Sequence, residues 1–275
     1  MKAEAMYVPA RAAFGKLVSA AEVVSVGASG IPSPTPQHYW ASVLFTRLVV
    51  TAKSIQTLTP TMGPNTHVDF SAVASIARNL AECYLFFFFL CIDDVPQDQK
   101  DARIILLNLH DDGSRAKLFA ELGEEEMDEE TRALRNVVRT DLETRFAANP
   151  YLAALSEKRR RELLKGEKTP FVQDDVIDRT DLDKKGFRFF YRFLSNHTHT
   201  GPVAFYRMSE HGRGAGFRNE KDTFYMASAL DFAAMLMTRA IRDMSGLFPE
   251  AEERGRKARS VKIRKPGKKV LRRRR

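Results

Sequence analysis

The helical spacing of apolar residues is the feature that most constrains this fold. In the segment 73–88, apolar side chains recur three or four residues apart, at Val73, Ala77, Leu80, Ala81, Tyr84 and Phe88. This spacing lines one face of an α-helix, whereas a half-buried strand alternates every second residue. Similar spacing runs through most of the chain, and clear strand alternation is nearly absent. The sequence therefore predicts an all-α protein, a multi-helix bundle.

Turn-rich breaks divide the chain into predicted helices. Glycine and proline gather in the breaks, for example GASGIPSPTP at 27–36, and they end helices. Asp183 is an expected N-cap, because its side chain can accept from the first free backbone N–H groups. We expect helices over residues 4–24, 37–58, 67–92, 97–122, 126–148, 151–165, 183–201 and 221–247. Together they would form one domain over 1–250 with its core at 67–247.

The most apolar run, YLFFFFLCI at 84–92, has nine residues and is too short to span a bilayer. We read it as a core helix, and we expect no transmembrane segment and no signal peptide. Cys83 and Cys91 lie on this helix, about 12 Å apart along its axis, which is too far for a disulfide. Two buried free thiols fit a reducing, cytoplasmic environment.

Positive charge is concentrated at the C-terminus. Residues 254–275 hold 13 Lys and Arg and no acid, while the other 253 residues hold 31 basic and 35 acidic side chains, a net charge of −4. Like charges in a block repel and stay unfolded. We therefore expect a mildly acidic folded body and a disordered basic tail over 251–275.

The segment 187–202, FRFFYRFLSNHTHTGP, places aromatic residues on two sides of a helix. A core stripe is formed by Phe187, Phe190, Tyr191, Leu194 and Thr198. Phe189 and Phe193 lie nearly opposite this stripe. A helix with aromatic residues on both sides is expected to be packed on both sides.

A line of polar residues runs between these aromatic faces. The spacing i, i+4, i+7, i+11 stacks four side chains: Arg188, Arg192, Ser195 and His199. His197 falls about 140° around the helix from Arg192 and does not join the line. Burying arginine and histidine beside aromatic rings is costly unless they are paired. The line should therefore face a carboxylate or a wet cleft.

The predicted helix 67–92 has a polar line with the same spacing, at Ser71, Ser75, Arg78 and Glu82. Two mostly apolar helices bury least charge when their polar lines meet. We therefore expect Glu82 to pair with Arg192 or Arg188, with Ser195 and His199 at the same seam. Structural roles are the alternative: an ordinary Arg78–Glu82 helix pair, a buried ion-pair role for Arg192, and a C-terminal cap by His199.

Three short motifs carry a resemblance: RNLAE at 78–82, LNLH at 107–110, and Tyr-Arg-x-Leu-Ser-x-x-x-His at 191–199. They look like those of a group of uncharacterised bacterial helical proteins, over roughly residues 69–202. That layout is similar to the HEPN superfamily of helical, often dimeric proteins, many of them metal-independent ribonucleases of toxin and phage-defence systems. The HEPN signature places a histidine four to six residues after an arginine. His197 and His199 both satisfy it, and helical geometry favours His199. Phe193 departs from the pattern, which usually has a polar residue there.

The resemblance implies RNA cleavage without a metal or other cofactor. Such cleavage needs a base, an acid and a cation at the phosphorane. Histidine titrates near neutral pH, and arginine is a permanent phosphate ligand. One histidine and one arginine per chain are too few, so a homodimer would complete the site. The candidate catalytic residues are Arg78, Glu82, Arg192, Ser195 and His199. The competing interpretation is a non-catalytic helical binding module.

The basic tail suggests a second, independent contact. Its candidate nucleic-acid-binding residues are Arg264, Lys265, Lys268, Lys269, Arg272, Arg273 and Arg274. Such arms bind RNA or another polyanion by counterion release, without sequence preference. The tail lacks interleaved aromatic residues, so base stacking by it is not expected. A solubility tail or an anionic membrane contact are the alternatives.

Overall fold

The computed structural model describes residues 2–63, 65–122, 128–206, 208–209 and 212–263. These residues form helices joined by loops, with a single isolated β-bridge, between His67 and Phe217, and so confirm the all-α prediction. The chain divides into two compact units, residues 1–91 with 183–275, and residues 92–182. We had expected a single domain over 1–250, without this division.

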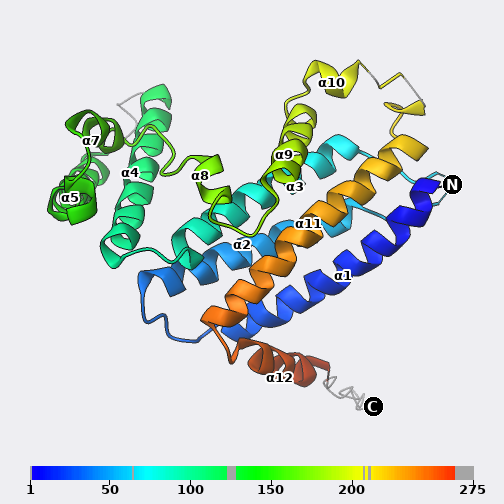
Figure 1. The fold of residues 1–275 in the computed structure, drawn as a ribbon, viewed down its shortest axis with the longest axis horizontal. Coiled ribbons are helices and arrows are strands. Elements are labelled where there is room, and N and C mark those ends of the chain that lie inside the picture. Colours follow the sequence, from blue (N-terminus) through cyan, green and yellow to red (C-terminus); the bar gives the residue numbers. More distant parts are fainter. Residues whose placement is uncertain (1, 64, 123–127, 207, 210–211, 264–275) are drawn as a thin grey trace, which may run out of the picture. The chain divides into compact units, whose positions relative to one another are not determined.

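The first unit is a bundle of long helices (Figure 1). Its elements are α1 (Lys2–Ala28), α2 (Pro36–Leu58), α3 (Phe70–Phe87), α9 (Lys184–Thr198), α10 (Pro202–Phe205), α11 (Glu220–Leu247) and α12 (Ala251–Ile263). α1 packs along α11 and α12, while α3 packs against α2, α9 and α11. The core between them is apolar, with Phe14, Phe45 and Leu236 fully buried.

Helix boundaries in this unit follow local capping. The Asp183 carboxylate accepts from the N–H groups of Lys185 and Gly186, which confirms the predicted N-cap of α9. Asp69 caps α3 by accepting from Ala72. α3 therefore begins at Phe70 rather than at residue 67, and a short π-helix, Phe88–Ile92, continues it. Such a wide turn is rare in helices.

Cys83 and Cys91 lie on this continuous helical segment. Both are buried and free, as expected. Burial raises the pKa of both thiols, that of Cys83 to about 12.

By length and composition alone, Phe70–Ile92 and Glu220–Leu247 are long and apolar enough to cross a membrane, and at least half of each apolar window is buried in the protein. Core helices of soluble proteins share these properties.

The second unit consists of α4 (Gln97–Leu122), α5 (Glu129–Ala148), α6 (Pro150–Ala153), α7 (Glu157–Leu164) and α8 (Gln173–Ile177). The predicted helix 151–165 is in fact two helices, because Ser156 starts α7 as an N-cap. His110 of the LNLH motif bonds through Nδ1 to the Gly166 carbonyl at 2.9 Å. Gly166 has a φ of +67°, and a Cβ there would lie 2.0 Å from the Leu109 oxygen. The motif therefore holds a tight chain crossing here.

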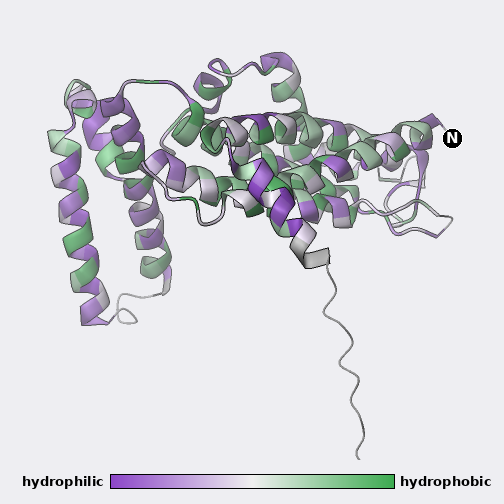
Figure 2. Cartoon of the chain, turned by 90° about the horizontal axis from the view of Figure 1, so that it is seen from below, coloured by the Kyte–Doolittle hydropathy of each residue, from purple (hydrophilic) through white to green (hydrophobic). Residues whose placement is uncertain are grey.

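α12 corrects our expectation that disorder begins at residue 251. It crosses α1 where Gly27 meets Gly255: a Cβ on Gly255 would lie 1.9 Å from the Val23 oxygen. Two of its cations are also paired one turn back, Arg256 with Glu252 and Lys257 with Glu253. Figure 2 shows α12 as mostly hydrophilic. The expectation of disorder was wrong here because it considered the repulsion between the cations but neither these acids nor the glycine contact.

The predicted nucleic-acid-binding residues all fall in 264–275. That segment, from Arg264 to Arg275, lies outside the described residues. α12 ends at Ile263, so residues 251–263 of the predicted disordered tail are helical, and the prediction that 264–275 binds polyanions stays a prediction.

Candidate functional site on helix α9

The polar line of α3 contacts α9 through Tyr191. Its hydroxyl donates to Glu82 Oε1 at 2.6 Å and accepts from Arg78 Nη2 at 3.0 Å. Arg78 also pairs directly with Glu82 at 2.9 Å. The Arg78 guanidinium lies over the Tyr191 ring, 5.1 Å from its centroid. Burial, followed by the hydrogen bond to Glu82, raises the pKa of Tyr191.

Arg78, Glu82 and Tyr191 form a triad, and it replaces the expected pairing of Glu82 with Arg192. The residue of α9 that reaches Glu82 is Tyr191, which we had placed on the core stripe. Arg192 lies about 100° further around the helix, and it is exposed, as is Arg188. Arg78 and Glu82 form the i, i+4 helix pair that the structural alternative described. They hold α9 in place and lie apart from the Arg192 face.

His197 and His199 have opposite environments. His197 is 3% exposed, and its ring lies 4.7 Å from Phe70 and 5.0 Å from Phe193, centroid to centroid. Burial and the nearby Arg213 lower its pKa to about 4, against the opposing effect of Asp222. His199 is exposed at the C-cap of α9, where its N–H donates to the Ser195 carbonyl. Of these two histidines, His199 is the one open to solvent.

A buried ion pair, which we did not predict from the sequence, lies beside His197. Arg213 Nε donates to Asp222 Oδ1 at 2.6 Å, and Asn219 Nδ2 donates to Asp222 Oδ2 at 2.7 Å. Arg213 lies in the glycine-rich segment GRGAG at 212–216. The sequence did contain one signal for it. Asn219 stands three residues before Asp222, a spacing typical of a helix N-cap, and this places Asp222 in the first turn of α11. A pocket of about 250 Å³ adjoins this pair, lined also by His67, Ser71 and Met208.

The exposed face of α9 gathers six side chains within an arc of about 100°: Lys185, Arg188, Phe189, Arg192, Asn196 and His199. Five are exposed and Asn196 is half-buried. Phe189 is 65% exposed, so α9 is not packed on both sides as we expected. Ser195 is half-buried at the edge of this face, and its hydroxyl donates to the Tyr191 carbonyl at 2.8 Å. Arg192 and His199 are thus brought together on one face, and Glu82 lies elsewhere.

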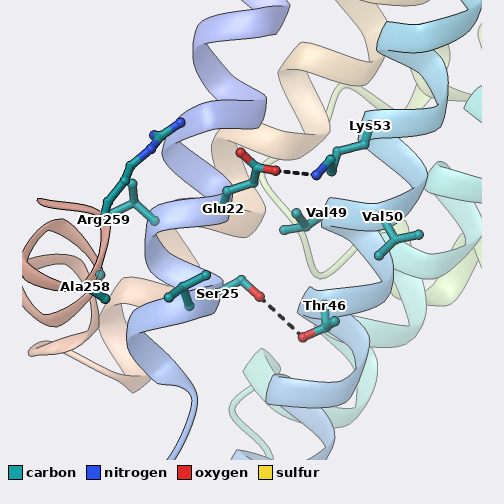
Figure 3. Close-up of a pocket in the computed structure, with 11 residues that line it drawn as sticks. Glu22, Ser25, Thr46, Val49, Val50, Lys53, Ala258 and Arg259 are labelled. Atoms are coloured by element: carbon teal, nitrogen blue, oxygen red, sulfur yellow. Dashed lines mark hydrogen bonds and ion pairs between the residues drawn. The ribbon is translucent and has the colours of Figure 1, made fainter. Parts of the chain in front are cut away.

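Another pocket, of about 350 Å³, lies between α1, α2 and α12 (Figure 3). Four valines supply most of its apolar lining: Val23, Val26, Val49 and Val50. The polar groups facing each other across it are paired, Glu22 with Lys53 at 2.6 Å and Ser25 with Thr46 at 3.4 Å. It contains none of the predicted site residues. Among the described residues, no three His, Cys, Asp or Glu side chains cluster so as to hold a metal ion.

A family model matches residues 38–215, which run from α2 to the loop after α10 and include both polar lines. The chain belongs to this family, a family of unknown function (DUF5677). The family is one of unknown function and this chain is all-helical, which agrees with the expected resemblance to uncharacterised helical proteins. No curated protein and no solved structure matches the chain.

Proposed function

We propose that this protein of the DUF5677 family acts on RNA as a metal-independent, HEPN-like endoribonuclease, with Arg192, Ser195 and His199 at its site. One observation carries the proposal. Arg192 and His199 are both exposed on one face of α9, while the competing His197 is enclosed by aromatic rings. Of the two histidines that satisfy the spacing, the accessible one is therefore on the same face as the arginine.

The chemistry assigns each residue a role. His199 takes the proton from the attacking 2′-hydroxyl or gives one to the leaving 5′-oxygen. Arg192 stabilises the charged phosphorane with planar donors. One chain supplies one such histidine on this face, so the complete acid–base pair requires a homodimer with α9 from each copy. Arg78 and Glu82 become positioning residues, because they hold Tyr191 and with it the helix.

The setting follows from the same proposal. A ribonuclease of this kind acts in the cytoplasm, as part of a toxin or phage-defence system, and the basic tail adds general affinity for RNA. No cofactor takes part in the proposed reaction.

A non-catalytic helical binding module is the second candidate. The observation favouring it is the Arg78–Glu82–Tyr191 triad, whose charges are engaged within the fold. In that case the α3–α9 seam is structural, and binding belongs to the tail and to exposed faces.

Cleavage of single-stranded RNA in EDTA by the purified full-length protein separates the two candidates. We expect cleavage by the wild type, and its loss in His199→Ala and in Arg192→Ala. Arg115→Ala is the matched control, because Arg115 is an exposed arginine on α4 of the other unit. A wild type that binds varied RNAs but cleaves none of them would replace the nuclease with the binding module.

A further inference from the structure

Helix α9 is cationic within a net acidic body. Residues 184–198 contain Lys184, Lys185, Arg188 and Arg192 and no acidic side chain. Lys185 and Arg192 are exposed on the same face. Exposed positive charge attracts a ligand of the opposite sign, so Lys185 and Arg192 suit this face to a polyanion although the body as a whole is net acidic.

The same face presents an aromatic ring that the fold leaves open. Phe189 is 65% exposed. Its ring is nonetheless held: it lies parallel to the Phe193 ring, at 6.4 Å between centroids and 2° between planes, and meets Phe190 edge-on at 5.5 Å. Phe193, itself half-buried, in turn contacts Tyr225 at 5.0 Å and the buried Phe70 at 5.7 Å. The exposed ring is therefore the outer end of an aromatic series fixed in the core.

An anchored, exposed ring beside cations is the chemistry that recognises an unpaired nucleotide. Bases stack on aromatic side chains when they are free of a duplex, and arginine contacts the adjoining phosphates. In a duplex the bases are already stacked on each other, so only the phosphates are available. Phe189 would then add affinity for single strands alone.

We infer that this face binds single-stranded RNA, with a base stacked on Phe189 and the backbone on Arg192. The inference rests on the proposed action on RNA but concerns binding rather than cleavage. Phe189 and His199 are ten residues apart, about 15 Å along the helix. The stacked base therefore belongs to a nucleotide that flanks the scissile phosphate, and the substrate must extend beyond the cleaved bond.

This arrangement divides recognition between α9 and the tail. The segment 264–275 has eight cations and no aromatic residue, so it binds single and double strands alike. A preference for single strands must then come from the folded body.

The test measures binding without cleavage. Full-length His199→Ala is the parent, and its affinity for a labelled 12-nucleotide single-stranded RNA and for the matching duplex is followed by fluorescence anisotropy. Adding Phe189→Ala should weaken single-strand binding by about tenfold, the effect typical of losing one stacked base, and leave duplex binding unchanged. Phe189→Trp should restore single-strand binding. Adding Arg192→Ala instead should weaken both and reduce the salt dependence by about one phosphate contact.

Phe217→Ala is the matched control, since Phe217 is 59% exposed and lies before α11, in the bridge to His67, rather than on α9. Equal single-strand affinity of the parent and the Phe189→Ala protein would overturn the inference. The inference would also be overturned if light scattering showed that Phe189→Ala turns a dimer into a monomer and this change accounted for the whole loss of RNA affinity. The face would then be an interface between copies of the chain. A wild type that binds through Phe189 without cleaving RNA would support this inference while refuting the nuclease.

Discussion

The enclosure of His197 should make the first unit sensitive to acid. In the folded protein its pKa is about 4, against an ordinary value of 6.5. As the pH falls, the unfolded chain therefore takes up the proton first, and the native state loses stability across the window from 6.5 to 4. Between pH 7 and pH 5 the two pKa values correspond to a loss of about 2 kcal/mol. Arg213 adds to this loss because its charge opposes protonation, while Asp222 reduces it.

Urea unfolding at pH 7 and pH 5 measures this loss. The single tryptophan, Trp40 on α2, reports on the unit that contains His197. In His197→Phe, whose ring would join Phe70 and Phe193, the loss between the two pH values should be about 2 kcal/mol smaller than in the wild type. His199→Gln, which removes an exposed histidine, should not show this reduction.

NMR titration of the His197 ring tests the same reasoning without relying on the variant to fold. We expect the ring to stay neutral through pH 5 and to titrate near pH 4. A midpoint near 6.5 would refute the enclosure, and His197 would then return as a competitor to His199 for the catalytic role.

Three further predictions concern the helix contacts and the tail. Gly255→Val should push α12 off α1 and speed tryptic cleavage within α12, whereas Gly246→Ala, which has open space around its Cβ position, should not. Tyr191→Phe removes a hydroxyl bonded to two charged groups and should lower the free energy of unfolding by about 1–2 kcal/mol. Unchanged urea unfolding would mean that the triad does not stabilise α9. Deleting residues 264–275 should lower the salt concentration that elutes the protein from heparin, without changing the tryptophan-monitored unfolding midpoint; unchanged elution would show that these cations do not bind polyanions.

The sequence predicted what local periodicity determines. The long helices and the Asp183 cap follow from spacing and capping chemistry, and so does the separation of His197 from the Arg192 line. Periodicity fixes which residues share a face, but not which face turns toward a neighbour. That choice depends on packing against α3, and there Tyr191 rather than Arg192 reaches Glu82. The close approach of Gly255 to α1 is likewise non-local, because its partner, Val23, lies more than 200 residues earlier.

The face that α9 turns toward α3 also decides which of its residues are open to a ligand. We had expected the Arg192 line to face α3, because two apolar helices bury least charge when their polar lines meet. With Tyr191 bonded to Glu82, however, Arg188, Arg192 and His199 are exposed, and Ser195 is half-buried at the edge of their face. Exposed arginine and histidine need no explanation, since charged side chains are ordinarily at the surface. Phe189 is different, because an exposed ring forgoes roughly 1.5–3 kcal/mol of possible burial and solubility gains nothing from it. Its position beside Arg192, on a helix without acids, is what makes this face a candidate binding surface rather than a solvated side of the bundle.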